Sequence, residues 1–435
     1  MKFMKCALAL GLTLALSVGC LSGCGAKEPS VPESIDLSAV TDPYLTTAGL
    51  SADTVVATVG ETEITADQLL YWIAYSADSL SQYYSSYTTE TELPWTTETE
   101  SGTLADSVKK TSVENAALYA LLPEQAQADG LELSQEYKDS FEVALEQMRQ
   151  ETGSEELYEH TLWYFPLTED LYTRLCDAEQ YNALIMEHRF GEGSDGYPTD
   201  DEVLTYLEED EQCYFFKHIL LMTEETTVEG DASAEGDASA SASTTVTDNS
   251  AEQLAQIEDI LQQLKDSDDP ITLFDQLMKQ YSEDGGRYSY PDGYLGSVNA
   301  NSSVGMKMNT PVEEACLALE EGQFSEIIEV QEDEGGYHGY HIVLRLPVEG
   351  NVDVEDYRQS YIAAQMSYLQ DQWLADNEIV TNENYDKIDA AAFYATLDLL
   401  RDAISEESYA AAEASSAASS AASSADTSAD SSANG

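Results

Sequence analysis

The first half of the chain alternates apolar and polar residues mostly at helical spacing. Thr65 and Gln68 have the spacing of a capping box, which predicts that a helix begins there. The same spacing recurs in five later stretches, at roughly 104–129, 134–151, 155–165, 168–190 and 200–210. A short β-rich run at 54–59 precedes them, and a Thr/Glu-rich stretch at 87–102 is expected to be a loop. Successive helices with almost no strands predict an irregular all-α domain.

The pattern changes at Cys213. Residues 213–222 are a run of strand formers, and shorter strand patterns follow near 294–298, 327–330 and 340–346. Helical spacing returns between them, at 252–265, 271–281 and 311–319. Strands and helices that alternate in this way predict a small α+β domain. Beyond Gly350, further helices are expected at 354–377 and 387–403.

Three segments have compositions that do not favour a packed core. Residues 24–52 are polar and rich in Ser, Pro and Thr, residues 224–250 form an acidic Ser/Ala-rich insertion, and residues 405–435 form an Ala/Ser/Asp-rich tail. Each segment buries too little apolar surface to offset the entropy lost on ordering. All three are therefore expected to be disordered, the first of them as a flexible tether.

The first 23 residues have the features of a secretory signal peptide. Lys2 and Lys5 precede an apolar run that is shorter than the ~20 residues needed to span a bilayer. The following Leu21-Ser22-Gly23-Cys24 resembles the bacterial lipobox, which implies a lipid on Cys24 and a mature chain that begins there. Two acyl chains would anchor the protein stably to the outer face of the cell membrane. An ordinary secretory signal with a chance cysteine is the alternative.

Charge and cysteine content exclude several kinds of site. The chain has 83 Asp+Glu and 18 Lys+Arg, a formal net charge of −65. Such a surface repels nucleic acids and anionic headgroups, so neither is expected to bind, although solubility alone would also explain the charge. Cys176, Cys213 and Cys316 are odd in number and far apart, which predicts small buried residues rather than disulfides. No His/Cys spacing indicates a metal site, and no cofactor is expected.

Five short motifs occur in a fixed order along the second half of the chain. They are KHIL (217–220), YSED (281–284), GYLG (293–296), PVEEA (311–315) and GYHIVLR (339–345). Their order and spacing resemble those of parvulin-type peptidyl-prolyl isomerases. The segments on either side are similar to those of PrsA- and SurA-like extracytoplasmic foldases, so the resemblance covers roughly residues 53–400.

The resemblance implies an α+β protein in which an isomerase domain is inserted into a helical chaperone lobe. The lobe is expected to combine an N-terminal helical domain at 53–212 with C-terminal helices at 349–404. The parvulin-like domain, a small antiparallel sheet flanked by helices, is expected at 213–348. It would contain the acidic insertion, whose Glu224 and Glu225 make recognition of a phosphorylated substrate unfavourable.

The family's active-site residues match individual positions of this sequence. The expected catalytic group consists of His218, Asp284 and His341. The expected socket for the proline ring and its polar neighbour consist of Leu295, Met308, Asn309 and Val312. Val312 occupies a position that is usually aromatic in the family, which predicts a shallow socket and reduced activity. The alternative for the two histidines is a structural pair that stabilises the sheet without a catalytic role.

This residue set suits the chemistry of prolyl isomerisation. Rotation about a peptide bond costs ~18–20 kcal/mol, and uncatalysed X-Pro exchange is slow enough to limit folding. The reaction needs neither a nucleophile nor a metal. An apolar socket can hold the proline ring while nearby polar groups favour the twisted amide.

Three functions follow from these features. The first is a lipid-anchored extracytoplasmic foldase that isomerises X-Pro bonds and binds unfolded secreted proteins; the resemblance leaves a homodimer open. The alternative is a holdase chaperone with a weak or inactive parvulin domain. The 27 tyrosines and four tryptophans could line a surface for unfolded chains or serve as ordinary core residues. The third function, solute binding, would require two α/β lobes, which residues 60–210 do not offer.

Overall fold

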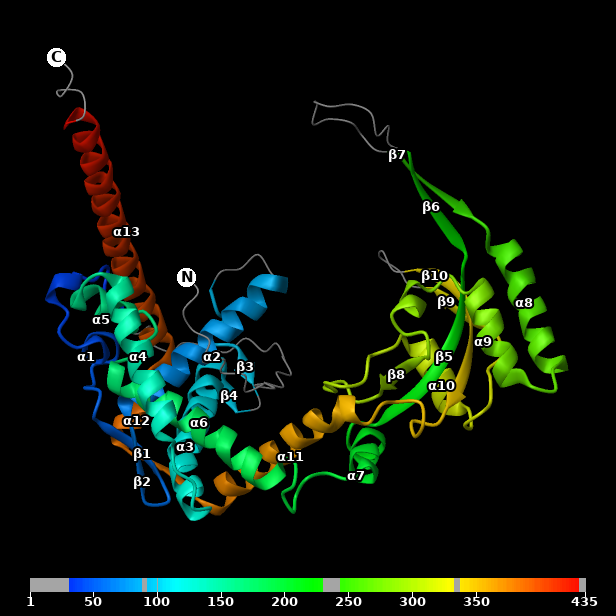
Figure 1. The fold of residues 1–435 in the computed structure, drawn as a ribbon, viewed down its shortest axis with the longest axis horizontal. Helices are drawn as coiled ribbons and strands as arrows, with labels where there is room; N and C mark the ends of the chain where they lie inside the picture. Colours follow the sequence, from blue (N-terminus) through cyan, green and yellow to red (C-terminus); the bar gives the residue numbers. More distant parts are fainter. Residues whose placement is uncertain (1–30, 88–91, 100, 230–242, 332–336, 430–435) are drawn as a thin grey trace. The chain divides into compact units, whose positions relative to one another are not determined.

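The computed structural model describes residues 31–87, 92–99, 101–229, 243–331 and 337–429 (Figure 1). The signal peptide expected at 1–23 and the expected lipid site Cys24 lie outside these residues. The chain forms two compact units. The helical unit comprises residues 1–195 and 366–435, and the sheet unit comprises residues 196–365. No helix of the described residues is both long and apolar enough to cross a membrane.

In its described residues, the helical unit consists of helices, many of them capped, a three-stranded sheet and a two-stranded hairpin. Ser134, Ser154 and Thr168 each accept a hydrogen bond from a backbone N–H of the helix that follows, as N-cap residues do. The helices are α1 (Pro43–Ala48), α2 (Ala66–Tyr87), α3 (Leu104–Ala128), α4 (Gln135–Thr152), α5 (Glu155–Trp163), α6 (Glu169–Phe190), α12 (Glu383–Lys387) and α13 (Ala390–Ala429), with α11 (Glu355–Asp376) crossing from the sheet unit. An antiparallel sheet has the order β11-β1-β2, and its strands are β1 (Val55–Val59), β2 (Thr62–Thr65) and β11 (Ile379–Thr381). A separate hairpin consists of β3 (Glu98–Thr99) and β4 (Gly102–Thr103).

The predicted helices of this region are confirmed. The helix expected near Thr65 is α2, and the five expected between 104 and 210 are α3 to α6 and α7 (Asp200–Thr205), which continues as a π-helical turn at Tyr206–Asp210. The sequence pattern did not predict β2 and β11, because strands of three or four residues contain too little alternation to be distinguished from loops. The overall α+β class is confirmed.

The sheet unit contains a four-stranded antiparallel sheet in the order β8-β5-β10-β9. Its strands are β5 (Cys213–Met222), β8 (Tyr294–Ser297), β9 (Ile328–Gln331) and β10 (His338–Leu346), and its helices are α7, α8 (Ser250–Asp266), α9 (Pro270–Tyr281) and α10 (Thr310–Ala318). Side chains alternate between the two faces of a strand. Phe215 and Ile219 therefore pack with α8 and α9 on one face, whereas Tyr214 and Phe216 pack with α10 on the other.

The boundaries between the units differ from those expected at 212/213 and 348/349. They fall at 195/196 and 365/366. Tyr206 and Leu207 belong to the core that β5 shares with α8 and α9, and Tyr357 and Tyr361 pack against the same core. The segments before and after the isomerase motifs are thus part of the sheet unit, because their apolar side chains are buried there.

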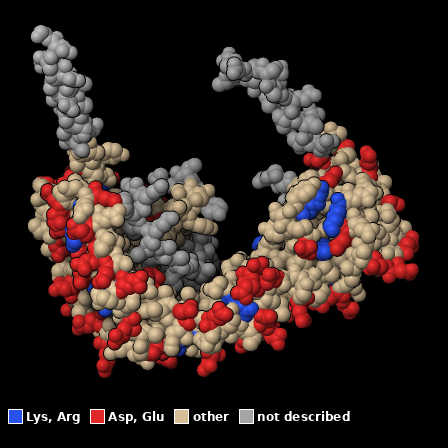
Figure 2. All heavy atoms as spheres, viewed as in Figure 1, with Lys and Arg blue, Asp and Glu red and all other residues tan. Residues whose placement is uncertain are grey.

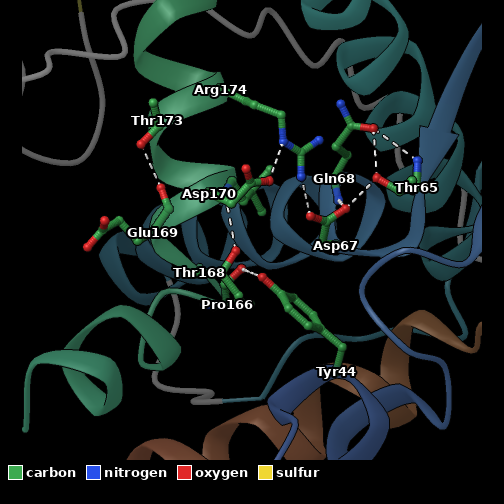
Figure 3. Close-up of polar contacts among 11 residues, drawn as sticks. Tyr44, Thr65, Asp67, Gln68, Pro166, Thr168, Glu169, Asp170, Thr173 and Arg174 are labelled. Atoms are coloured by element: carbon green, nitrogen blue, oxygen red, sulfur yellow. Dashed lines mark hydrogen bonds and ion pairs between the residues drawn. The ribbon is translucent and has the colours of Figure 1, made fainter. Parts of the chain in front are cut away.

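The polar segment at 31–52 is not a free tether. Asp42 caps α1, Pro43 occupies its first turn, and Gly49 ends it with φ of 71°. Tyr44 is buried and donates a hydrogen bond from its hydroxyl to the carbonyl oxygen of Pro166 at 2.9 Å (Figure 3). The expectation of disorder was wrong here because composition concealed a short helix with good caps and one large buried side chain.

Two further expectations of disorder are corrected. The segment expected to be a disordered tail from 405 continues α13 to Ala429. Alanine has the highest helix propensity, and no Gly or Pro interrupts this stretch. In the acidic insertion, β6 (Glu224–Glu229) pairs with β7 (Ser243–Asp248) in an antiparallel hairpin, since both strands are rich in β-branched Thr and Val. Residues 230–242 and 430–435 lie outside the described part of the chain.

Charged residues and cysteines follow the composition. Figure 2 shows Asp and Glu scattered over the visible face of each unit, with far fewer Lys and Arg. Cys176, Cys213 and Cys316 are buried, as predicted. Burial raises the pKa of both the Cys213 and the Cys316 thiols to about 12, so neither is a reactive thiolate at neutral pH.

Candidate active site

Two histidines meet on one face of the four-stranded sheet. His218 lies on β5 and His341 on the neighbouring strand β10. The register pairs His218 with Val343 and His341 with Leu220, so the two histidines are diagonal neighbours rather than directly opposite each other. Their rings are nearly parallel, with centroids 5.2 Å apart, and their Nδ1 atoms are 3.1 Å apart. Both residues are buried, and His341 is 0% exposed.

Asp284 completes this group from the segment after α9. One of its oxygens, Oδ2, lies 3.0 Å from Nε2 of His218 and also accepts a hydrogen bond from the Tyr294 hydroxyl. The other oxygen accepts a hydrogen bond from the Gly286 N–H at 3.0 Å. The segment is held beside His218, because the adjacent Glu283 N–H donates to the Leu220 carbonyl oxygen at 2.7 Å. The structure thus brings together the three residues that were expected to be catalytic.

The environment sets the charge of each member of the group. Burial acts to raise the pKa of Asp284, but hydrogen bonds from His218 and Tyr294 outweigh it and hold that pKa well below its ordinary 3.8. Burial and the nearby His218 lower the pKa of His341 from 6.5 to about 3. Burial also raises the pKa of the Tyr294 hydroxyl, which therefore keeps its proton. At neutral pH the group consists of an ionised Asp284, an uncharged His341 and a hydrogen-bond donor at Tyr294.

A second set of polar contacts reaches His341 from the opposite side. The Tyr337 hydroxyl lies 3.0 Å from Nε2 of His341 and accepts a hydrogen bond from the Asn309 side-chain Nδ2 at 2.6 Å. Asn309 is the N-cap of α10, and its Oδ1 accepts a hydrogen bond from the Val312 N–H at 3.3 Å. From the sequence, no role was assigned to Tyr337, or to Tyr294, although the GYLG motif contains Tyr294. Tyr294 could have been identified from strand alternation, because it pairs with Phe216 on the same face as His218.

A cavity of about 960 Å³ opens beside His218. His218 and Asp284 contribute polar groups to its wall. Tyr290, Tyr294, Met306 and Met308 are among the residues that contribute apolar surface to it. A volume of this size falls in the usual range for ligand sites. The cavity can therefore hold an apolar ring next to a group that donates and accepts hydrogen bonds.

The structure corrects the position of two residues that were expected in the socket. Leu295 pairs with Phe215 and lies in the core against α8 and α9, on the far face of the sheet. Val312 lies on α10, is fully buried in a cluster with Tyr214, and does not line the cavity. Met308 and Asn309 do line it. Side chains alternate along β8, so the residue that reaches the cavity is Tyr294 rather than its neighbour Leu295.

The charged residues that line the cavity differ in whether their charged groups are already hydrogen-bonded within the protein. Glu283 lines it, but its carboxylate accepts hydrogen bonds from the Met222 N–H at 2.6 Å and from the Gln253 side chain. Asp284 is engaged with His218. Lys307 also lines the cavity and is exposed. The cavity therefore combines two carboxylates that are already hydrogen-bonded with a solvent-accessible ammonium group.

Comparison with known proteins assigns the central part of the chain. Residues 218–346 match the family model described as "Rotamase: PPIC-type PPIASE domain". No curated protein matches the chain. The three catalytic positions expected from the sequence motifs lie within the matched residues.

Three solved structures are similar to the chain at low identity. The foldase protein PrsA from Streptococcus pneumoniae str. Canada MDR_19A is 13% identical with a TM-score of 0.26, over 65% of this chain and 89% of that one. The peptidylprolyl isomerase PrsA from Bacillus cereus is 13% identical with a TM-score of 0.28, over 77% and 96%. The peptidylprolyl isomerase PrsA from Bacillus anthracis is 14% identical with a TM-score of 0.23, over 61% and 96%. Because these scores are low, the assignment of the domain rests on the family model.

Proposed function

We propose, from the premise that residues 218–346 are a parvulin-type peptidyl-prolyl cis-trans isomerase domain, that the chain is an extracytoplasmic foldase anchored to the membrane by a lipid. Its substrates would be X-Pro bonds in unfolded or partly folded secreted proteins. The observation that carries the isomerase part is the juxtaposition of His218, His341 and Asp284 with an apolar cavity of about 960 Å³.

The geometry suits rotation of an amide bond. The proline ring would occupy the part of the cavity formed by Met306, Met308 and Tyr294, where it is removed from water. The preceding carbonyl would then turn beside the histidines. Loss of amide resonance in the twisted state makes the peptide nitrogen more basic and the carbonyl less polar, so polar groups held in fixed positions can favour it over the planar forms.

The test is the rate of prolyl isomerisation of a proline-containing peptide, with a chain that begins at residue 24 and carries Cys24→Ser. His218→Ala and Asp284→Ala are expected to lower kcat/KM at least about tenfold, the effect of losing one interaction of about 1.4 kcal/mol. Matched controls are His188→Ala, on the exposed side of α6, and Asp292→Ala, exposed in the same loop as Asp284. A folded parent without activity would refute the isomerase and leave the alternative, a holdase with an inactive parvulin domain.

The helical unit is proposed to bind unfolded chains. Support comes from its exposed aromatic residues, among them Tyr83 at 60% and Tyr409 at 76% exposure, since amphipathic aromatic rings suit contact with unfolded segments. The His218→Ala variant should still suppress aggregation of a reduced, unfolded client, because its helical unit is unchanged. If suppression disappears together with isomerase activity, the helical unit does not bind clients by itself.

Residues 1–24 support the proposed location. The basic start, the short apolar run and the lipobox-like Leu21–Cys24 sequence favour export and lipidation at Cys24. Expression of the whole chain with a labelled fatty acid should yield a labelled, membrane-bound protein. Cys24→Ser should abolish the label and release the protein, whereas Cys20→Ser should leave both unchanged. A labelled Cys24→Ser protein would refute lipidation at this residue.

A further inference from the structure

A continuous run of hydrogen bonds connects the start of α10 with Asp284. It passes from the Val312 N–H to Asn309 Oδ1, and from Asn309 Nδ2 to the Tyr337 hydroxyl. From there it passes to Nε2 of His341, across the two Nδ1 atoms to His218, and from Nε2 of His218 to Asp284. The separations along the run are 3.3, 2.6, 3.0, 3.1 and 3.0 Å. Every imidazole nitrogen of the two histidines therefore has a partner.

The first contact of this run fixes the orientation of the Asn309 side-chain amide. A backbone N–H can only donate, so the Asn309 atom that faces Val312 is the carbonyl oxygen Oδ1. The amide nitrogen of Asn309 then faces Tyr337 and donates to its hydroxyl oxygen. Since that oxygen accepts one hydrogen bond, its own proton is available to His341.

The same direction propagates through both histidines. In this direction Tyr337 donates to Nε2 of His341, which then has no proton of its own. An uncharged imidazole with an unprotonated Nε2 carries its proton on Nδ1, and this proton is donated to Nδ1 of His218. His218 in turn carries its proton on Nε2 and donates it to Asp284.

The far end of the run requires the same direction independently. An ionised carboxylate only accepts hydrogen bonds, and Asp284 accepts them from the Gly286 N–H and the Tyr294 hydroxyl as well. His218 must therefore present Nε2–H to Asp284, as the argument from α10 also concludes. Hydrogen bonds that all point the same way strengthen one another.

We propose that Asn309 and Tyr337 are positioning residues that fix which nitrogen of each active-site histidine carries the proton. Nothing in the sequence motifs assigns this role to either residue. Its importance for catalysis rests on the isomerase function of the domain, but the proton positions themselves do not. The ionisable groups that face His341 are His218 from β5, Asp284 beyond it, and Tyr337 from the segment before β10. On β9, His341 is paired with the apolar Ile328.

The test uses nitrogen-15 NMR of the five histidines in the Cys24→Ser chain, assigned by single His variants. The parent should show the proton of His341 on Nδ1 and that of His218 on Nε2. Tyr337→Phe removes the donor to Nε2 of His341, so its signals should shift toward a mixture of the two tautomers. Its kcat/KM should fall about threefold to tenfold, the effect of one neutral hydrogen bond. Tyr340→Phe is the matched control, because Tyr340 lies on the other face of β10.

Asn309→Asp gives a sharper outcome. An aspartate still accepts the Val312 N–H and so keeps the helix cap, but it cannot donate to Tyr337. The Tyr337 proton should then turn toward residue 309, and Nε2 of His341 should acquire a proton. The proton of His341 should therefore move from Nδ1 to Nε2, and the signals of both histidines should differ from those of the parent.

Two results would overturn the proposal. One is a parent protein in which His341 carries its proton on Nε2. The other is unchanged histidine signals in both Tyr337→Phe and Asn309→Asp while each variant keeps the fold of the parent. A parent protein that is inactive but shows the expected tautomers would refute the isomerase function. It would still support the proposed role of Asn309 and Tyr337 in fixing the proton positions.

Discussion

Acidification should destabilise the sheet unit through His341. This residue is 0% exposed, and burial with the neighbouring His218 lowers its pKa from 6.5 to about 3. Between these two values the unfolded chain binds a proton at this position and the folded chain does not. Stability therefore falls as the pH decreases through this window, and the full cost is reached below about pH 3. The variant His341→Gln, which cannot take up a proton, should lack this part of the pH dependence.

The magnitude follows from the same two values. At pH 7 neither state is appreciably protonated, so the contribution is close to zero. At pH 5 the unfolded histidine is protonated while the folded one is not, which costs about 2 kcal/mol. Asp284 does not contribute in this interval, because its folded pKa lies below its ordinary 3.8 and it is ionised in both states. The interval from pH 7 to pH 5 therefore separates His341 from Asp284.

The assay must report on the sheet unit alone. The four tryptophans are Trp72, Trp95, Trp163 and Trp373, and all of them lie in the helical unit. Tryptophan fluorescence therefore follows the helical unit and serves as an internal control. Hydrogen exchange of the β5 and β10 amides follows the sheet unit, because these strands contain its core.

The parent and the His341→Gln variant are compared at pH 7 and pH 5, after correction for intrinsic exchange rates. Protection of β5 and β10 should fall about 30-fold more in the parent than in the variant, the equivalent of 2 kcal/mol. Equal pH dependence in the two proteins would refute the reasoning, because it would mean that the folded His341 takes up a proton as readily as the unfolded one. Unfolding of the helical unit should show the same pH dependence in both.

Three further predictions concern other parts of the chain. Lys307→Glu should lower kcat/KM for peptides with an acidic residue before the proline by about threefold to tenfold, relative to kcat/KM for neutral peptides. The effect should be smaller at high salt. An unchanged ratio of the two kcat/KM values would contradict this prediction. Arg401→Met should destabilise the helical unit by about 1–3 kcal/mol in urea unfolding followed by tryptophan fluorescence, because the guanidinium pairs with Asp78 through both terminal nitrogens. The control is Lys110→Met, which removes the exposed ion pair with Glu114 and should change the free energy of unfolding by no more than about 0.5 kcal/mol. Equal effects of Arg401→Met and Lys110→Met would contradict the prediction that the Arg401 pair stabilises the unit more. Replacing residues 225–247 by an Asn-Gly turn should leave isomerase activity within about twofold, since the hairpin strands pair with each other, and a folded but inactive product would show that the hairpin is required.

Local periodicity was sufficient to predict most of the helices and the four main strands. α3, α4 and α6 have clear caps and at least four turns, so their predicted ends lie within two residues of the observed ones. Composition was a poorer guide for the segments at 31–52 and 405–429. In the first, a single side chain, Tyr44, is buried by contacts far away in the sequence. In the second, alanine content favours a helix even where it contributes little apolar surface.

The juxtaposition of His218, Asp284 and His341 could be predicted from motifs because each motif places one residue at a fixed point of a strand or loop. The socket could be predicted only in part. Leu295 is the apolar residue of its motif, yet strand alternation places Tyr294 on the cavity side. The same alternation along β5 places His218 and Ile219 on opposite faces of the sheet. The sequence therefore contained the information needed to place Tyr294, rather than Leu295, on the side of the cavity.

The hydrogen bond between Asn309 and Tyr337 is a tertiary contact that no local sequence pattern predicts. Asn309 precedes Thr310 and Pro311, a good start for a helix, so its role as the cap of α10 is readable from the sequence. Its second contact, to Tyr337, joins residues 28 positions apart and depends on how the chain enters β10. Because the cap fixes the orientation of the amide, the start of α10 and the proton positions on His341 are parts of one structure. A substitution that disturbs this cap should therefore alter the histidines even if the socket itself is unchanged.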